Sequence, residues 1–320
     1  TQDATKQLEA ILRERPTNER ALFVLGGIKR DLDKLDEAAA HFETVLKINS
    51  KFEPAYYELA SVRLFQNKPR ETLATLRKAA EQFKPNFINK FYAGLAHSSL
   101  HQYPKAIENL LEAEQLAQAA EQNRLTHFFY FQLGAAYERN RQYETANTIL
   151  KKAIEISPEY HNAMNYLGYM WADINRNLDE AAKYIIKANE LDPENAAYVD
   201  SLGWLHYRQG KHKEALAELQ RAAELMKDEP DSTIHEHIGD ALQQLGKADE
   251  AGAEWEISLG LLREQEKKMT VPDAYLLEQL GNVLNKLGRT DKARTAWQRS
   301  YEITPTEPLR QKLHSVKKEE

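Results

Sequence analysis

The chain has 320 residues, with 43 Lys and Arg against 49 Asp and Glu, and a formal net charge of -6. It therefore lacks the basic surplus of nucleic-acid-binding domains, and no stretch approaches the roughly 18 apolar residues of a membrane helix. The sequence has no Cys and only 13 Gly and 11 Pro, which excludes disulfides, thiolate metal sites and cysteine nucleophiles and favours an all-helical fold.

The first segment, residues 1–18, places Leu8, Ile11 and Leu12 on one helical face before Pro16. This pattern is typical of the second helix of a repeat whose first helix is missing. We therefore expect the natural protein to extend upstream of Thr1.

From the next segment onward, small residues recur with a period of about 34 residues. They are Gly26, Ala60, Gly94, Gly134, Gly168, Gly203, Gly239 and Gly281. A second series pairs a small residue with a large side chain four positions later. These pairs are Ala38 and Phe42, Thr72 and Leu76, Ala106 and Leu110, Ala146 and Leu150, Ala181 and Ile185, Ala215 and Leu219, Ala251 and Trp255, and Ala293 and Trp297. We expect two amphipathic helices in each period, with backbones that approach closely at the small residues and a large side chain filling the space beside them.

This pattern resembles the tetratricopeptide-repeat family. The resemblance implies an all-α solenoid, a right-handed superhelix of helix-turn-helix repeats whose first helices line a concave groove. We predict eight full repeats, over residues 19–52, 53–86, 87–126, 127–160, 161–195, 196–231, 232–273 and 274–306. A capping helix over 307–320 is expected to follow, with an apolar stripe at Leu309, Leu313 and Val316. The two longest spacings predict lengthened second helices, with the extra residues in 114–126 and 259–273.

No catalytic constellation is recognisable along these repeats, and no stretch remains for a separate catalytic domain. His97 and His101 have the spacing of a two-histidine metal site, but no nearby carboxylate completes it. His235 and His237 alternate, so their side chains point to different helix faces, and we interpret them as surface histidines. We expect no enzyme, no metal site and no cofactor.

The first helices carry a further stripe, offset from the packing residues. Its first part is aromatic and consists of Tyr57, Phe91, Phe128, Phe131, Tyr169, Trp204 and Tyr207. The family resemblance places this stripe in the groove, so the rings as a set predict a surface that binds a protein or peptide partner. Alternatively, the rings pack between neighbouring first helices.

Farther along, the same stripe becomes acidic, at Asp200, Glu236, Asp240 and Glu278. Glu236 and Asp240 form a like-charge pair that costs a few tenths of a kcal/mol in an isolated helix. We interpret the pair as one that stability did not select, and the acidic face is either a functional patch or an ordinary solvated face. The expected ligand has apolar anchors at one end and Lys or Arg at the other, with Asn162 and Asn165 hydrogen-bonding its backbone between them.

The charge of the chain is divided in the same way. Residues 1–160 carry 22 basic and 21 acidic side chains, whereas residues 161–320 carry 21 and 28. The formal charge therefore changes from +1 in the first half to -7 in the second, which agrees with an acidic end of the groove.

The stretch from Asn165 to Trp255 resembles, more specifically, the tetratricopeptide lipoproteins of Gram-negative bacteria. Its motifs include Asp200-Ser201-Leu202-Gly203-Trp204 and His237-Ile238-Gly239-Asp240. The resemblance implies a periplasmic, outer-membrane-tethered adaptor that presents substrates to a protease, with a cytoplasmic location as the alternative. The lipid-bearing cysteine of such proteins is absent from this sequence. The groove positions also lack the lysines, arginine and asparagines with which chaperone-docking relatives bind a terminal carboxylate.

We thus predict a non-enzymatic scaffold or adaptor that binds protein partners in its groove. One alternative is the substrate-recruiting arm of a larger enzyme whose catalytic domain lies outside this sequence. Another is a structural protein that self-associates through Leu261, Leu262 and the lengthened helices.

Overall fold

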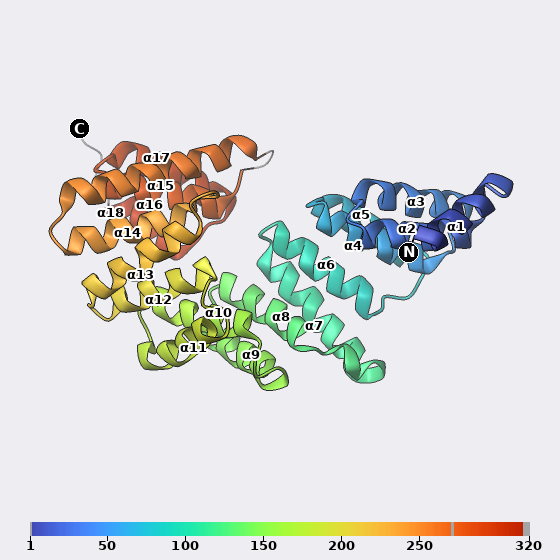
Figure 1. Cartoon of the computed structure of the whole chain (residues 1–320), viewed down its shortest axis with the longest axis horizontal. Coiled ribbons are helices and arrows are strands. Elements are labelled where there is room, and N and C mark those ends of the chain that lie inside the picture. The colour runs from blue at the N-terminus through green and yellow to red at the C-terminus, as the bar shows by residue number, and fades with distance from the viewer. Residues whose placement is uncertain (1, 270–271, 316–320) are drawn as a thin grey trace. The chain divides into compact units, whose positions relative to one another are not determined.

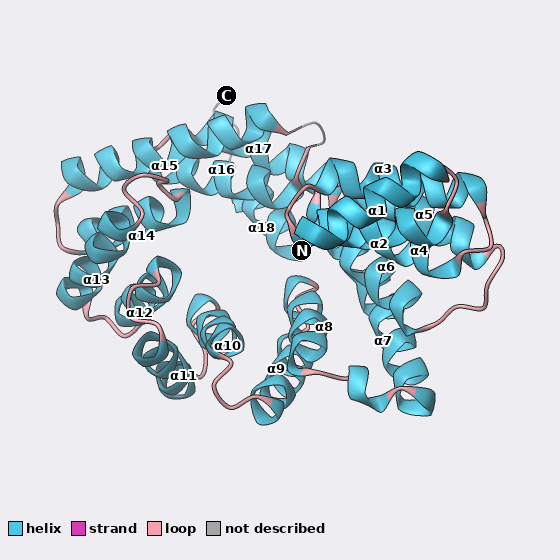
Figure 2. Cartoon of the chain, turned by 45° about the vertical axis from the view of Figure 1, so that its right-hand side comes forward, coloured by secondary structure: helices cyan, strands magenta, loops and turns pink. Residues whose placement is uncertain are grey.

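The computed structural model describes residues 2–269 and 272–315 (Figure 1). This part of the chain contains eighteen α-helices, one short 3-10 helix and no strand, which confirms the all-α prediction (Figure 2). Its helices are too short or too polar to cross a membrane. The chain divides into two compact units, residues 1–158 (unit 1) and 159–320 (unit 2), and each is described by itself.

Unit 1 begins with α1 (Gln2–Glu14) and continues as consecutive helix pairs. The pairs are α2 (Glu19–Asp31) with α3 (Leu35–Ile48), α4 (Glu53–Phe65) with α5 (Pro69–Ala80), α6 (Phe87–Ser99) with α7 (Tyr103–Ala120), and α8 (His127–Arg139) with α9 (Tyr143–Ile156). The 3-10 helix Gln122–Arg124 follows α7.

Unit 2 has the same construction. Its pairs are α10 (His161–Asp173) with α11 (Leu178–Leu191), α12 (Ala196–Arg208) with α13 (His212–Leu225), α14 (Ser232–Gln244) with α15 (Ala248–Lys268), and α16 (Ala274–Lys286) with α17 (Thr290–Ile303). The last helix, α18 (Glu307–Ser315), packs on α17 and buries Leu309. Val316 and the rest of the predicted cap lie outside the described residues.

Several first helices begin at a side chain that accepts a hydrogen bond from the backbone of the first turn. These N-caps are Asn18, Asn86, Thr126, Asp231 and Asp273. A cap of this kind stabilises a helix by about 1 kcal/mol, because it satisfies a backbone N–H that has no partner within the helix. The caps thereby fix where α2, α6, α8, α14 and α16 begin.

The predicted close approach of paired helices is confirmed. A Cβ atom added at Gly239 would lie 2.4 Å from Nε1 of Trp255, and one added at Gly281 would lie 2.3 Å from Cδ1 of Trp297. The corresponding distances to the side chain of the second helix are 2.6–2.8 Å at Gly26, Gly94, Gly134, Gly168 and Gly203. At these seven glycines the first helix can lie against its partner only because the contact residue has no side chain, whereas α4 has Ala60 at the equivalent position.

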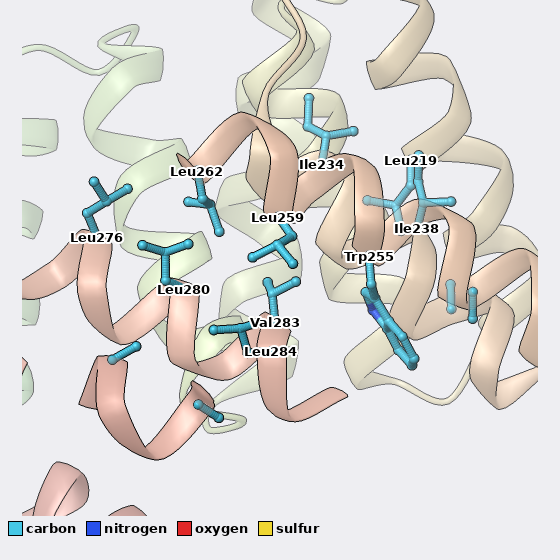
Figure 3. Close-up of a cluster of buried hydrophobic side chains, with 14 of the residues drawn as sticks. Leu219, Ile234, Ile238, Trp255, Leu259, Leu262, Leu276, Leu280, Val283 and Leu284 are labelled. Atoms are coloured by element: carbon cyan, nitrogen blue, oxygen red, sulfur yellow. The ribbon is translucent and has the colours of Figure 1, made fainter. Parts of the chain in front are cut away.

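Helix pairs also pack on one another, as the core of unit 2 shows (Figure 3). In this core, Leu259 and Leu262 of α15 lie among residues of α14 and α16, and both are 1% exposed. Burying a leucine side chain stabilises a fold by about 1.5–3 kcal/mol. A single helix pair leaves such residues uncovered, so the neighbouring pairs are required.

The predicted lengthening of two second helices is also observed. Helix α15 has 21 residues and α7 has 18, whereas α17 has 14. The extra turns of α15 place Leu262 in the core, so this residue does not form the self-association surface that the sequence suggested. Leu261 beside it is half-buried.

Substitution of Gly281 by Ala is expected to destabilise unit 2 by about 1–3 kcal/mol, because the new methyl group would overlap the rigid indole of Trp297. The matched control is Gly252→Ala in α15, where an added Cβ meets no atom within 4 Å. It should stabilise the protein by about 0.5–1 kcal/mol through helix propensity alone. Urea unfolding followed by circular dichroism measures both changes, and equal effects would show that the close approach does not govern pairing.

Candidate functional site

The fifth residue of each first helix forms one series along the chain. In unit 1 the series is Phe23, Tyr57, Phe91 and Phe131, and in unit 2 it is Asn165, Asp200, Glu236 and Glu278. The ninth residues of the unit 2 helices, one turn later, are Tyr169, Trp204, Asp240 and Asn282. Most of the predicted site residues therefore lie at equivalent positions, and their contacts decide which of them can meet a partner.

Asp200 and Trp204 lie together with a residue that the sequence analysis placed on the surface. His237 is 5% exposed, and its Nδ1 lies 2.9 Å from Oδ1 of Asp200, which is itself 6% exposed. The imidazole stacks on the Trp204 indole at 3.9 Å between ring centroids, and Tyr207 stacks on the same indole at 4.7 Å. His237 is therefore a core residue, and its interpretation as a surface histidine was wrong.

The other two predicted carboxylates share a lysine from the next first helix. Nζ of Lys286 donates to Oε1 of Glu236 at 2.6 Å and to Oδ2 of Asp240 at 2.7 Å. Both carboxylate side chains are largely buried, at 14% and 11% exposed, and Nε1 of Trp255 donates to Asp240 at 3.1 Å. The like-charge pair is thus bridged by a cation, and the interpretation that stability did not select it is corrected.

A related arrangement recurs one repeat later. Nζ of Lys312 in α18 lies 2.8 Å from both Glu278 and Asn282, and Nε1 of Trp297 donates to Asn282 at 3.1 Å. In sequence, each motif has a polar residue directly after the contact glycine and a tryptophan 15 positions later. This signal could have identified the tryptophan contacts, but it does not indicate the lysines.

Burial and neighbouring carboxylates have opposite effects on the pKa values of Lys286 and His237. Burial alone would lower the pKa of Lys286, but Glu236 and Asp240 outweigh it and raise the pKa. Burial likewise opposes a charged His237, and the carboxylates of Asp200, Glu236 and Asp240 outweigh it, so the pKa of His237 is raised. Both groups therefore hold their protons more tightly than in water.

The predicted asparagines are in different environments. Asn162 accepts a hydrogen bond from the hydroxyl of Tyr198 and also bonds Tyr160, so its amide is engaged within the chain. Oδ1 of Asn165 is buried and has no hydrogen-bond partner among the described residues. Tyr169 is half-buried, and burial together with nearby carboxylates raises the pKa of its hydroxyl well above the ordinary value.

In unit 1, two of the predicted aromatic residues fill spaces between helices. The Tyr57 hydroxyl donates to Oε1 of Glu53 and accepts from Asn86, both at 2.9 Å, and burial raises the pKa of this hydroxyl. The Phe91 ring of α6 lies 5.8 Å from the Phe129 ring of α8 between centroids. These contacts fit the alternative that rings pack between neighbouring first helices.

Phe128 is the exception among the predicted aromatic residues. It is 44% exposed, whereas the others are buried or half-buried. Its ring meets the edge of Phe91 at 6.2 Å, and Phe131 lies nearly one turn farther along α8. We call Phe91, Phe128 and Phe131 the aromatic patch of unit 1.

His97 and His101 lie in different local structures. His97 lies in α6, whereas His101 lies in the following turn with a left-handed φ of 57°, so the two do not share a helical face as predicted. Nδ1 of His97 instead lies 2.8 Å from Oε1 of Gln102. Across residues 2–269 and 272–315, no three His, Asp or Glu side chains are arranged to hold a metal ion.

Replacement of Lys286 by Met is expected to destabilise unit 2 by about 2–3 kcal/mol, because it leaves two largely buried carboxylates facing each other without a cation. The control is Lys267→Met, which removes an exposed i, i+3 pair with Glu264 and should change stability by less than about 0.5 kcal/mol. Urea unfolding at low salt compares the two variants. Similar small losses would show that the bridge has no structural role.

Comparisons with known proteins agree with this architecture. Family models described as tetratricopeptide repeats match residues 1–52, 129–160, 175–232 and 201–259, just over half of the chain. The TPR repeat-containing protein PA4667 of Pseudomonas aeruginosa is 29% identical over 195 residues, which cover 59% of this chain and 31% of that protein. Anaphase-promoting complex subunit 3 of Schizosaccharomyces pombe is 30% identical over 98 residues, covering 31% of this chain and 15% of that subunit.

The matches therefore span about a third or less of these two relatives. Among solved structures, the anaphase-promoting complex hetero-tetramer Cut9-Hcn1 is similar with a TM-score of 0.56. The alignment covers 98% of this chain and 58% of that one, at 14% identity, and shows the fold alone. With its paired helices, contact glycines and matching family models, the chain belongs to the tetratricopeptide-repeat family.

Proposed function

We propose that this protein is a non-enzymatic scaffold that binds a partner protein through its first helices, with the aromatic patch of unit 1 as the main contact. The observation that carries the proposal is the 44% exposure of Phe128 beside the half-buried Phe91 and Phe131. The other predicted aromatic residues already pack within the chain, so this patch is the part of the predicted surface that offers an apolar ring to a partner. Repeat surfaces of this kind supply extended areas for binding.

The described contacts favour an apolar anchor on the partner. Burying an exposed aromatic ring in an interface contributes on the order of 2 kcal/mol when the ring is a hot spot. In unit 2 the carboxylates at Glu236 and Asp240 are paired with Lys286, and Asp200 is paired with His237. A basic segment would have to compete with these internal partners, so we propose a partner whose affinity depends on apolar contact rather than on Lys or Arg.

We propose a periplasmic location for this scaffold, tethered to the outer membrane by a lipid anchor outside this sequence, and recruitment of cell-envelope machinery such as a protease. The support is the resemblance of residues 165–255 to tetratricopeptide lipoproteins and the match to a Pseudomonas aeruginosa protein with the same repeats. Fractionation of cells that express the full natural protein tests the location, since recovery in the cytoplasm would contradict it.

Phe128→Ala is expected to weaken binding of the isolated partner about 10- to 30-fold, mainly through faster dissociation. The matched control is Phe65→Ala, which removes a ring that is 69% exposed at the end of α4 and lies outside the patch. Both rings are exposed, so both variants should keep the parent's helical circular dichroism spectrum. A partner captured from a native extract, then purified, provides the probe for surface plasmon resonance.

The expected salt dependence is weak, because the main contact is apolar. If Phe65→Ala weakened binding and Phe128→Ala did not, the turn between α4 and α5 would be the docking surface and the proposal would be wrong. If both variants bound the partner as the parent does, the aromatic patch would not be the contact surface.

A further inference from the structure

His237 lies where three first helices of unit 2 meet. It belongs to α14, and its Nδ1 lies 2.9 Å from Asp200 of α12. Its ring stacks on Trp204, which is also in α12, with an interplanar angle of 13°. The Tyr169 ring of α10 lies 6.4 Å from the imidazole. Only 5% of the His237 surface is exposed. A positive charge on this imidazole is therefore unfavourable unless neighbouring groups of opposite charge compensate it.

The groups that face the imidazole carry an excess of negative charge. Asp200 contributes from α12, and Glu236 and Asp240 contribute from α14 itself. Lys286 of α16 supplies one positive charge, which the last two share. Three carboxylates therefore meet one ammonium group, and an imidazolium at His237 supplies the second cation.

Two further groups lie close to this cluster. The Tyr169 hydroxyl stays neutral, because burial and neighbouring carboxylates raise its pKa. The guanidinium of Arg208 in α12 lies 4.5 Å from the centre of the Trp204 ring, on the indole that also stacks with His237. Neither group replaces a protonated His237 as the partner of Asp200, because it is Nδ1 of His237 that contacts this carboxylate.

We propose that protonation of His237 acts as a pH-sensitive latch that holds α14 against α12 and α10. The imidazolium pairs with Asp200 and keeps the indole of Trp204 stacked, so the three helices pack tightly. The neutral imidazole leaves a buried carboxylate with only a neutral hydrogen-bond donor, which weakens the contact between helices. The latch is independent of the aromatic patch, because it lies in unit 2 and rests on different residues.

The direction of the pH effect follows from the raised pKa of His237. In the unfolded chain this side chain titrates near pH 6.5, so the stabilisation is fully present below about that pH. It is lost as the pH rises through the higher pKa of the folded state. Each unit of difference between the two pKa values corresponds to about a tenfold larger folding equilibrium constant at low pH than at high pH.

The test uses the full chain and a matched pair of variants on the same helix. His237→Gln keeps a hydrogen-bond donor but cannot titrate, and His235→Gln removes a half-buried histidine whose Nδ1 lies 2.6 Å from Glu254. Urea unfolding between pH 6 and pH 8.5 should show a fall in the midpoint of unit 2 for the parent and for His235→Gln. The fall should be smaller in His237→Gln, because that side chain cannot titrate.

A second measurement observes the titration of His237 in the parent protein directly. The histidine ring signals of the isotope-labelled parent are titrated by nuclear magnetic resonance, and the His237 signal is assigned by its absence in His237→Gln or by its shift in Asp200→Asn. We expect His237 to titrate above pH 6.5 with a concurrent change in Trp204 fluorescence, read against Trp204→Phe. A midpoint at or below 6.5, or the same pH dependence in His237→Gln as in the parent, would overturn the latch.

Discussion

The close approach of paired helices at a residue without a side chain is the constraint on which the rest of this structure depends. At Gly281 even a methyl group would lie within 2.3 Å of the Trp297 indole, so the two backbones are as near as a large side chain between them allows. This distance sets the angle at which the helices of a pair cross and the residues that each pair leaves uncovered. Those uncovered residues then require another pair, which is why the chain continues as a stack.

The same contact shows how tryptophan adapts the stack to polar neighbours. Where most pairs use Phe, Leu or Ile, α15 and α17 use Trp255 and Trp297, whose Nε1 atoms donate to Asp240 and Asn282 directly after the contact glycines. A buried indole N–H without a partner costs about 1–3 kcal/mol, so the polar residue is needed to accept its hydrogen bond when the helices pack. Part of the apparent binding surface is thus needed for pairing.

The charges of unit 2 show that a stripe of acidic residues is not by itself a binding surface. Lys286 and His237 each come from a first helix other than that of the carboxylate they neutralise, so charge pairing ties successive repeats together. Largely buried carboxylates are strongly destabilising when their partner is removed, even though the pair as a whole contributes little compared with apolar packing. The formal charge of -7 in the second half therefore overstates what a ligand would meet there.

The sequence by itself determined the all-α class, the pairing of helices, the contact glycines and the lengthened α7 and α15. These features follow from periodicity, because a residue's neighbours within a helix or an adjacent helix are fixed by short spacings. It also identified Phe128, although it could not separate this exposed ring from Phe91 and Tyr57, which pack within the chain.

Only the tertiary structure decided which polar residues have partners. Asp200 and His237 are 37 residues apart, and Lys286 is 46 and 50 residues from the carboxylates it bridges. Contacts across such separations depend on how one repeat is placed on the next. Helical periodicity in the sequence does not indicate that placement. Burial of His237 and of the acidic pair is decided in the same way, because a side chain on the outer face of a single helix becomes internal only when the following repeats cover it.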